Sequence, residues 1–152
     1  MKTFEDYFSE LQADMVSVCL DYLKKCGVEI SAANNIYIHC SYERSRTCNF
    51  FFRISGKMVQ RHKVSDTARD REKGYQGKAL DSLIENLYEL GDICKQHEKP
   101  MPTEIRLVYD IQENRLEAAY KYDPIVDTDK EKLAADFAEE WFEQLAKKFD
   151  KE

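Results

Sequence analysis

Apolar residues recur every three to four positions in three stretches of this chain, and they alternate with polar residues in most of the segments between. In the first stretch, from Phe4 to about Lys25, they fall at the spacing of one buried helical stripe. Thr3 and Asp6 match a capping box before this stretch. Gly27 after it can adopt the left-handed backbone conformation that commonly ends a helix. The pattern predicts an amphipathic helix with both ends marked.

Three short strands are predicted to follow. Alternating apolar residues mark the segments Ile36–Tyr42 and Cys48–Ile54, and Met58–Val64 is a more polar third strand. Ser55-Gly56 suits a two-residue hairpin, so we expect an antiparallel meander. The third strand is expected at a sheet edge, protected against pairing with another chain by two basic side chains, Arg61 and Lys63.

The apolar pattern stops between Asp66 and Lys78, where the sequence predicts a charged loop that contains the aromatic residue Tyr75. A second helix is predicted from about Ala79 to His97, ended by the segment KPMP because proline disfavours helical geometry in the residue before it. Tyr75, placed in the loop, is the aromatic residue that packing explains least.

Two more strands are predicted, Ile105–Tyr109 and Leu116–Tyr122, joined by a polar QEN turn. A third helical stripe follows at Leu133, Phe137, Trp141, Leu145 and Phe149. Thr128 and Glu131 form a second capping-box pattern ahead of it.

These elements predict an α+β fold in one domain spanning residues 1–152. The expected order is α-β-β-β-α-β-β-α, with an antiparallel sheet of about five strands and three helices packed mainly on one face. One sheet face should be apolar, and the other wet or covered. There is no βαβ alternation, P-loop or GxGxxG pattern, so no known nucleotide-binding motif is present.

The formal net charge of −6 disfavours direct binding to nucleic acid or to an anionic membrane, and a cationic partner is easier to accommodate. The amino terminus lacks the basic and apolar regions of a secretion signal, so we expect a cytoplasmic protein. The five cysteines are an odd number without a CxxC motif, which favours reduced thiols in the core.

Catalytic chemistry has little support in the sequence. His39, His62, Cys40 and Cys48 are the candidates for a metal site, but their spacing matches no usual zinc pattern. Cys40 and Cys48 are expected to be near neighbours across the first hairpin, with His39 on the opposite face from Cys40. We predict no catalytic residue, no cofactor and no enzyme.

Charge is segregated along the chain. Residues Lys57 to Lys78 contain seven Lys or Arg against three acids, whereas Asp123 to Glu143 contain eight acids against two Lys. The acids of the second segment are typical of a solvated face, and the same segregation also suits a complementary partner. The partner-binding candidates are Asp123, Asp127, Asp136, Glu139, Glu140, Glu143 and Tyr75.

The chain resembles the YezG-like immunity proteins, small bacterial domains that neutralise polymorphic toxins made by the same cell. The resemblance lies in IYIHCSYE, in FFFRISGKMV, in the helix LDSLIENLYELGDICKQH, and most closely in KPMPTEIRLVYDIQENRLEAAYKYD. The chain differs at Met101-Pro102, where members often carry a tryptophan, and in its last helix.

This resemblance implies a stoichiometric inhibitor of a cognate protein toxin, with a nuclease as the favoured class of toxin. Acids between Asp123 and Glu143 would then oppose a surface that binds phosphate, while Arg69, Arg71 and Tyr75 offer a second contact that favours an acidic partner. Two alternatives stay open. One is an adaptor or oligomeric scaffold, such as a homodimer with the third helix at its interface, and the other is a small metal-dependent enzyme.

Overall fold

The structure, a computed structural model, describes residues 2–43, 45–64, 74–124 and 133–149. Its five strands form one antiparallel sheet in the order β3-β2-β1-β4-β5, which confirms the predicted α+β class. In chain order the elements are α1 (Phe4–Lys25), η1 (Ile30–Ala32), β1 (Ala33–Tyr42), β2 (Arg46–Ile54), β3 (Lys57–Gln60), α2 (Arg61–Val64), α4 (Tyr75–Gln96), β4 (Glu104–Asp110), β5 (Arg115–Lys121) and α5 (Ala134–Phe149).

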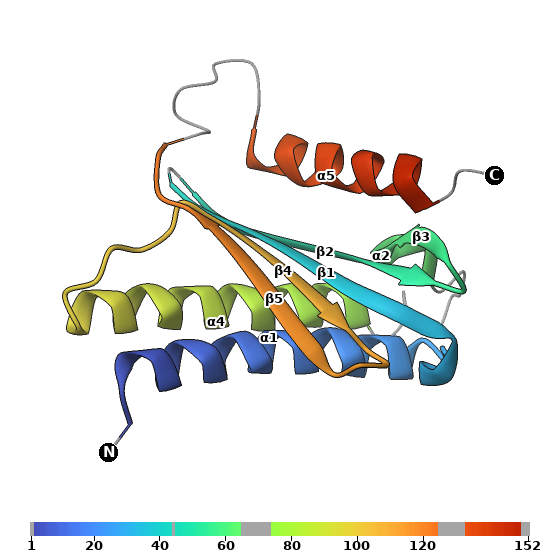
Figure 1. Ribbon diagram of the computed structural model, residues 1–152, viewed down its shortest axis with the longest axis horizontal. Helices are drawn as coiled ribbons and strands as arrows, with labels where there is room; N and C mark the ends of the chain where they lie inside the picture. Colours follow the sequence, from blue (N-terminus) through green and yellow to red (C-terminus); the bar gives the residue numbers. More distant parts are fainter. Residues whose placement is uncertain (1, 44, 65–73, 125–132, 150–152) are drawn as a thin grey trace.

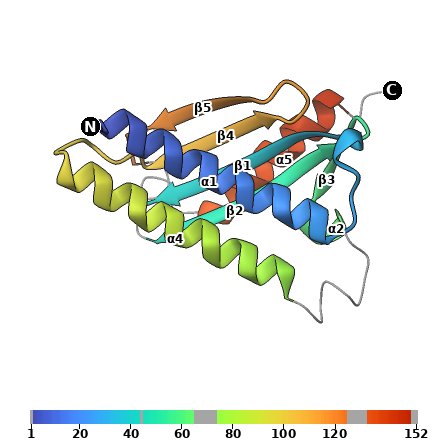
Figure 2. The same cartoon turned by 90° about the horizontal axis from the view of Figure 1, so that it is seen from below.

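The sheet lies between two layers of helix (Figure 1). Helices α1 and α4 run side by side across one face, as Figure 2 shows, and α5 covers part of the other face. The third helix is therefore not on the face where we expected most helical packing. The central strands need this second cover because they are apolar on both sides, with Tyr37 and Phe51 directed away from α1 and α4.

The larger core fills the space between the sheet and the α1–α4 layer. Strand alternation directs Ile36, Ile38, Phe50 and Phe52 to this side, where they are fully buried. The helices close the core with Met15, Cys19 and Leu23 from α1 and with Leu83, Leu87 and Leu90 from α4. The helical stripes that the sequence predicted are thus the buried faces of α1 and α4.

Several predicted local signals are confirmed. The Asp6 amide donates to Thr3 Oγ1 at 3.2 Å, and the Thr3 amide donates to Asp6 Oδ2 at 3.0 Å, which completes the capping box of α1. Ser55 and Gly56 join β2 to β3 with φ values of 51° and 84°. Two positive φ values are what the hairpin turn favoured by strand twist requires.

Two predicted boundaries are wrong. The third strand ends at Gln60, and the next four residues form α2, so Arg61 and Lys63 belong to a helical turn and not to the edge strand. Helix α4 begins at Tyr75, four residues earlier than expected, so Tyr75 is helical and not in a loop. The rest of the predicted loop before Gly74 and the pair Thr128 and Glu131 lie outside the described residues.

Candidate partner-binding surface

Four of the partner-binding candidates lie together on one side of α5. Asp136, Glu139, Glu140 and Glu143 follow the spacing i, i+3, i+4 and i+7, which places them on a single helical face. Asp136, Glu139 and Glu143 are exposed, and Glu140 is half-buried. We call this set the acidic stripe. It lies on the opposite side of the helix from Trp141, which faces the sheet.

Aromatic packing fixes the inner side of α5 against the sheet. Trp141 is 8% exposed and meets Tyr37 and Phe51 edge-on, with ring centroids 5.6 and 5.4 Å away. Phe142 meets Phe51 edge-on at 5.1 Å, and the Arg53 guanidinium lies 4.4 Å from the Phe149 ring centroid. These contacts hold the helix in one rotation, so the acidic stripe is directed to solvent.

Asp136 and Glu139, two of the residues in the acidic stripe, also bind other parts of the chain. The Leu133 amide donates to Asp136 Oδ2 at 2.8 Å, so Asp136 satisfies an orphan donor at the start of α5. Gln60 Nε2 lies 3.3 Å from both carboxylate oxygens of Glu139, which ties the stripe to the end of the edge strand β3. Asp136 is therefore partly structural, and Glu139 and Glu143 are the better candidates for contact with a partner.

The remaining acidic candidates are not gathered with this stripe. Asp123 is exposed after the end of β5, and its backbone carbonyl accepts a hydrogen bond from Thr103 Oγ1 at 2.7 Å. Asp127 lies outside the described residues.

A buried polar cluster lies beneath Trp141, on the same face of the sheet. Glu104 is 2% exposed and lies 2.8 Å from His39 Nε2, 3.4 Å from Arg106 Nε and 3.7 Å from Lys121 Nζ. The Arg106 guanidinium also lies 5.0 Å from the Trp141 ring. Burial raises the pKa of Glu104, but the hydrogen bond and charge of His39, together with Arg106 and Lys121, more than offset this and leave the pKa below its usual value.

No motif or spacing in the sequence singles out Glu104 as a site residue. Its signal was the alternation of β4, which places Glu104 and Arg106 on the same face. Their meeting with His39 depends on the β1–β4 register, which pairs His39 with Arg106. The cluster supports the underside of α5, and each buried charge has an opposite charge nearby.

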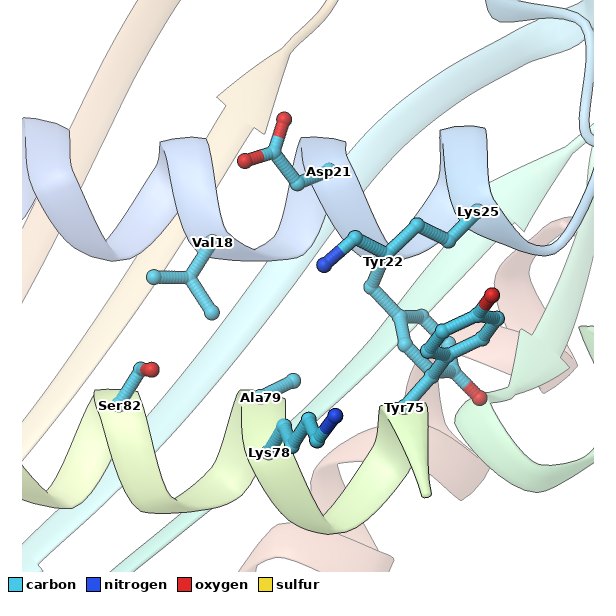
Figure 3. A pocket seen from close by; sticks show the side chains of 8 residues that line it. All are labelled: Val18, Asp21, Tyr22, Lys25, Tyr75, Lys78, Ala79 and Ser82. Atoms are coloured by element: carbon cyan, nitrogen blue, oxygen red, sulfur yellow. The ribbon is translucent and has the colours of Figure 1, made fainter. Parts of the chain in front are cut away.

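Tyr75 lines a shallow groove of about 120 Å³ between α1 and α4 (Figure 3). The residue is half-buried against the main core, and Lys25 Nζ lies 5.6 Å from its ring centroid. Tyr75 is thus explained by packing on α1, contrary to the expectation of an unpacked loop aromatic. It lies across the sheet from α5, because α1 and α4 cover the opposite face.

An aromatic groove that the sequence analysis did not identify lies where α1 begins and β5 ends. It has a volume of about 320 Å³, and its lining includes Phe4, Phe8, Lys99, Tyr120 and Tyr122. Tyr120 is 37% exposed and Tyr122 53% exposed, so these residues of the YKYD segment lie at the surface. Exposed tyrosines such as Tyr120 on the edge strand β5 and Tyr122 just after it are typical of protein-binding surfaces.

Of the four residues of the metal-site alternative, Cys40 and Cys48 lie together, with Sγ atoms 3.6 Å apart, but neither histidine joins them. His39 is buried on the α5 face, Cys40 lies in the core on the other face, and His62 is exposed in α2. No cluster of three or more metal-ligating side chains occurs within the described ranges.

Comparison with known proteins finds no family model that matches the chain and no match among curated proteins. In the part of the chain that the structure describes, no helix is both long enough and apolar enough to cross a membrane.

Proposed function

We propose that this protein binds and neutralises a cognate bacterial toxin by stoichiometric protein–protein inhibition, with a nuclease as the favoured toxin. The observation that carries the proposal is the acidic stripe, a row of carboxylates on the outer side of a helix whose inner side is fixed by aromatic packing. The resemblance to YezG-like immunity proteins supports the same function. We place this action in the cytoplasm, without a catalytic residue or cofactor.

Electrostatic complementarity supplies the physical reason. A nuclease surface that binds phosphate is basic, and a preformed row of carboxylates attracts such a surface from a distance. The stripe lies on a helix that is already folded and docked on the sheet, so little backbone order must be created on binding. We expect rapid association that slows as the salt concentration rises, because salt screens exposed charges.

The test begins with co-purification of the tagged protein from its native cells, with mass spectrometry of any partner that survives a moderate salt wash. The partner is then assayed for nuclease activity with and without the purified protein. Inhibition at a one-to-one ratio supports the proposal. A partner without toxic activity, or inhibition that requires a large excess, contradicts it.

Charge reversal then tests the contacting face. We expect Glu139→Lys, Glu140→Lys and Glu143→Lys together to lower the association rate at least tenfold and to remove most of its salt dependence. The matched control reverses Glu85, Glu89 and Asp92, exposed acids at similar helical spacing on α4. Both variants change the net charge equally, so an equal effect of the two would show that only overall charge matters and would reject the stripe as the contact.

A second candidate is a non-catalytic adaptor or oligomeric scaffold, favoured by the aromatic groove beside the edge strand β5. This groove offers a homodimer an exposed surface, whereas the apolar side of α5 already packs against its own sheet. Light scattering at increasing concentration distinguishes the two functions. A dimer that Tyr122→Ser converts to a monomer would favour the scaffold over the immunity protein.

A further inference from the structure

We propose that Cys40 and Cys48 form a dithiol pair that closes to an intramolecular disulfide under oxidising conditions. The two residues are direct partners in the β1–β2 register, and their Sγ atoms lie 3.6 Å apart. Both are free thiols in the structure. The inference is independent of toxin binding, since it rests on the first hairpin and not on α5.

Backbone geometry places the pair at a position suited to a cross-strand bond. The Tyr42 amide donates toward β4, to the Thr103 carbonyl at 2.9 Å. Strand alternation then directs the Cys40 amide toward β4 as well, so Cys40 and Cys48 face each other as a non-hydrogen-bonded pair of the β1–β2 ladder. Such pairs have Cα atoms about 4.5 Å apart, within the range that a disulfide spans.

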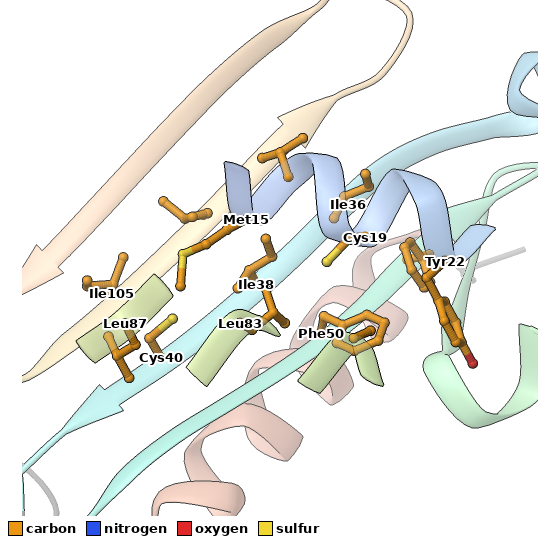
Figure 4. Packing of buried hydrophobic residues seen from close by; sticks show 14 of the residues in the cluster. Met15, Cys19, Tyr22, Ile36, Ile38, Cys40, Phe50, Leu83, Leu87 and Ile105 are labelled. Carbon is orange, nitrogen blue, oxygen red and sulfur yellow. The ribbon is translucent and has the colours of Figure 1, made fainter. Parts of the chain in front are cut away.

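The two thiols differ in their access to solvent. Cys48 is half-buried, whereas Cys40 is 1% exposed and packs against the main core, near Leu87 in Figure 4. The hydrogen bond with Cys48 and then burial raise the pKa of Cys40 well above its usual value, which keeps Cys40 protonated. Cys48 is thus the thiol that an oxidant reaches first, and Cys40 is the thiol that resolves the intermediate.

The reaction needs a small-molecule disulfide such as oxidised glutathione. Cys48 loses its proton, and its thiolate attacks one glutathione sulfur, which breaks the S–S bond and releases one glutathione as its thiol after protonation. Cys40 then loses its proton, and its thiolate attacks Cys48 Sγ and displaces the second glutathione, which takes up a proton. The protein loses two electrons and two protons, and the oxidant is reduced to two thiols.

The test uses the full chain, first reduced, then freed of reductant and incubated with oxidised glutathione before all remaining thiols are alkylated in denaturant. We expect the protein to lose two of its five thiols, and peptide mapping to find Cys40 joined to Cys48. Five alkylated thiols after prolonged incubation would overturn the proposal. So would a disulfide that joins either residue to Cys19, the other buried thiol near this pair.

Single substitutions test the two assigned roles. In Cys40→Ser, the mixed disulfide with glutathione should accumulate on Cys48, because no resolving thiol remains. In Cys48→Ser, Cys40 should stay reduced, because it is buried. Glutathione on Cys40 in this second variant, at the rate seen for Cys48 in the first, would reject the order of steps.

Discussion

At the scale of single residues, Glu104 is the one buried carboxylate among the described residues, with His39, Arg106 and Lys121 around it. Such a group contributes stability through its hydrogen bond to His39 and its ion pairs with Arg106 and Lys121, and its removal leaves these partners without their acceptor. Its pKa is lower in the folded chain than in the unfolded chain. The stability it contributes is therefore present above the unfolded pKa and is lost as pH falls through the folded pKa.

We expect Glu104→Gln to lower the free energy of unfolding by about 2 kcal/mol at pH 7, because a charged hydrogen-bond acceptor becomes neutral. The difference from wild type should shrink below about pH 4, where the unfolded chain protonates its glutamates. Urea denaturation at a series of pH values measures both effects.

Glu117→Gln is the matched control, since Glu117 is an exposed glutamate on β5 that lies 3.9 Å from Arg115. It should change the free energy of unfolding by less than about 0.5 kcal/mol at any pH. A Glu104→Gln defect that stays constant down to acid pH would show that the carboxylate charge is not responsible.

At the scale of elements, α4 is held close to the end of β1 at one glycine. A Cβ atom built on Gly91 would lie 2.5 Å from the Tyr42 hydroxyl and 2.8 Å from the ring carbon that bears it. Gly77, in the first turn of the same helix, has nothing within 4 Å of its Cβ position. Packing therefore requires a glycine at position 91, whereas at position 77 it leaves room for a larger side chain.

We expect Gly91→Ala to destabilise the protein by about 1 kcal/mol, because overpacking against Tyr42 exceeds the gain in helix propensity. Gly77→Ala should instead stabilise the protein by up to about 1 kcal/mol, because it brings only the gain in propensity. The midpoints of thermal unfolding of the two variants, measured under the same conditions, test both predictions. A stabilising Gly91→Ala would mean that the Tyr42 ring moves aside without cost.

Elements with a clear period could be predicted from the sequence, and those without one could not. The alternation at Ile36, Ile38 and Cys40 has the strand period of two, and the structure follows it. The start of α4 has no such signal, because Gly74 precedes it with positive φ and no side-chain cap, and its first residues are mostly polar. A four-residue helix such as α2 is too short for any period to appear.

The candidate surface was partly predictable for the same reason. The spacing from Asp136 to Glu143 is visible in the sequence, and its place on one helical face follows from helix geometry alone. The position of α5 on the second face of the sheet was harder to predict. It follows only if Tyr37 and Phe51 are taken as part of a second core. The pairing of His39 with Glu104 needed the strand register, which local sequence patterns do not supply.

At the scale of the whole molecule, the sheet separates two cores of unequal size. The core under α1 and α4 draws buried residues from both long helices and three strands, whereas the core under α5 has Tyr37, Phe51, Met58 and Trp141 at its centre. Because less apolar surface holds α5 in place, this helix should open more often than the rest of the molecule.

We expect native-state hydrogen exchange to show a lower opening free energy for α5 amides than for those of β1 and β4. Trp141→Ala removes the largest side chain of the smaller core, so it should lower the opening free energy of α5 by about 3 kcal/mol or more. The control, Tyr88→Ala on the exposed side of α4, should leave α5 exchange unchanged. Equal protection of α5 and β1 in the wild type would show that the two cores unfold as one unit.

The position of the single tryptophan gives the molecule an intrinsic optical probe. Trp141 is buried on the inner side of the same helix that carries the acidic stripe outside. A partner that binds the stripe while α5 stays docked should leave the indole in its dry surroundings and its emission unshifted. A partner that pulls α5 from the sheet should expose the indole and shift its emission to longer wavelength. Intrinsic tryptophan fluorescence during titration with the partner therefore distinguishes binding to docked α5 from binding to α5 that has left the sheet.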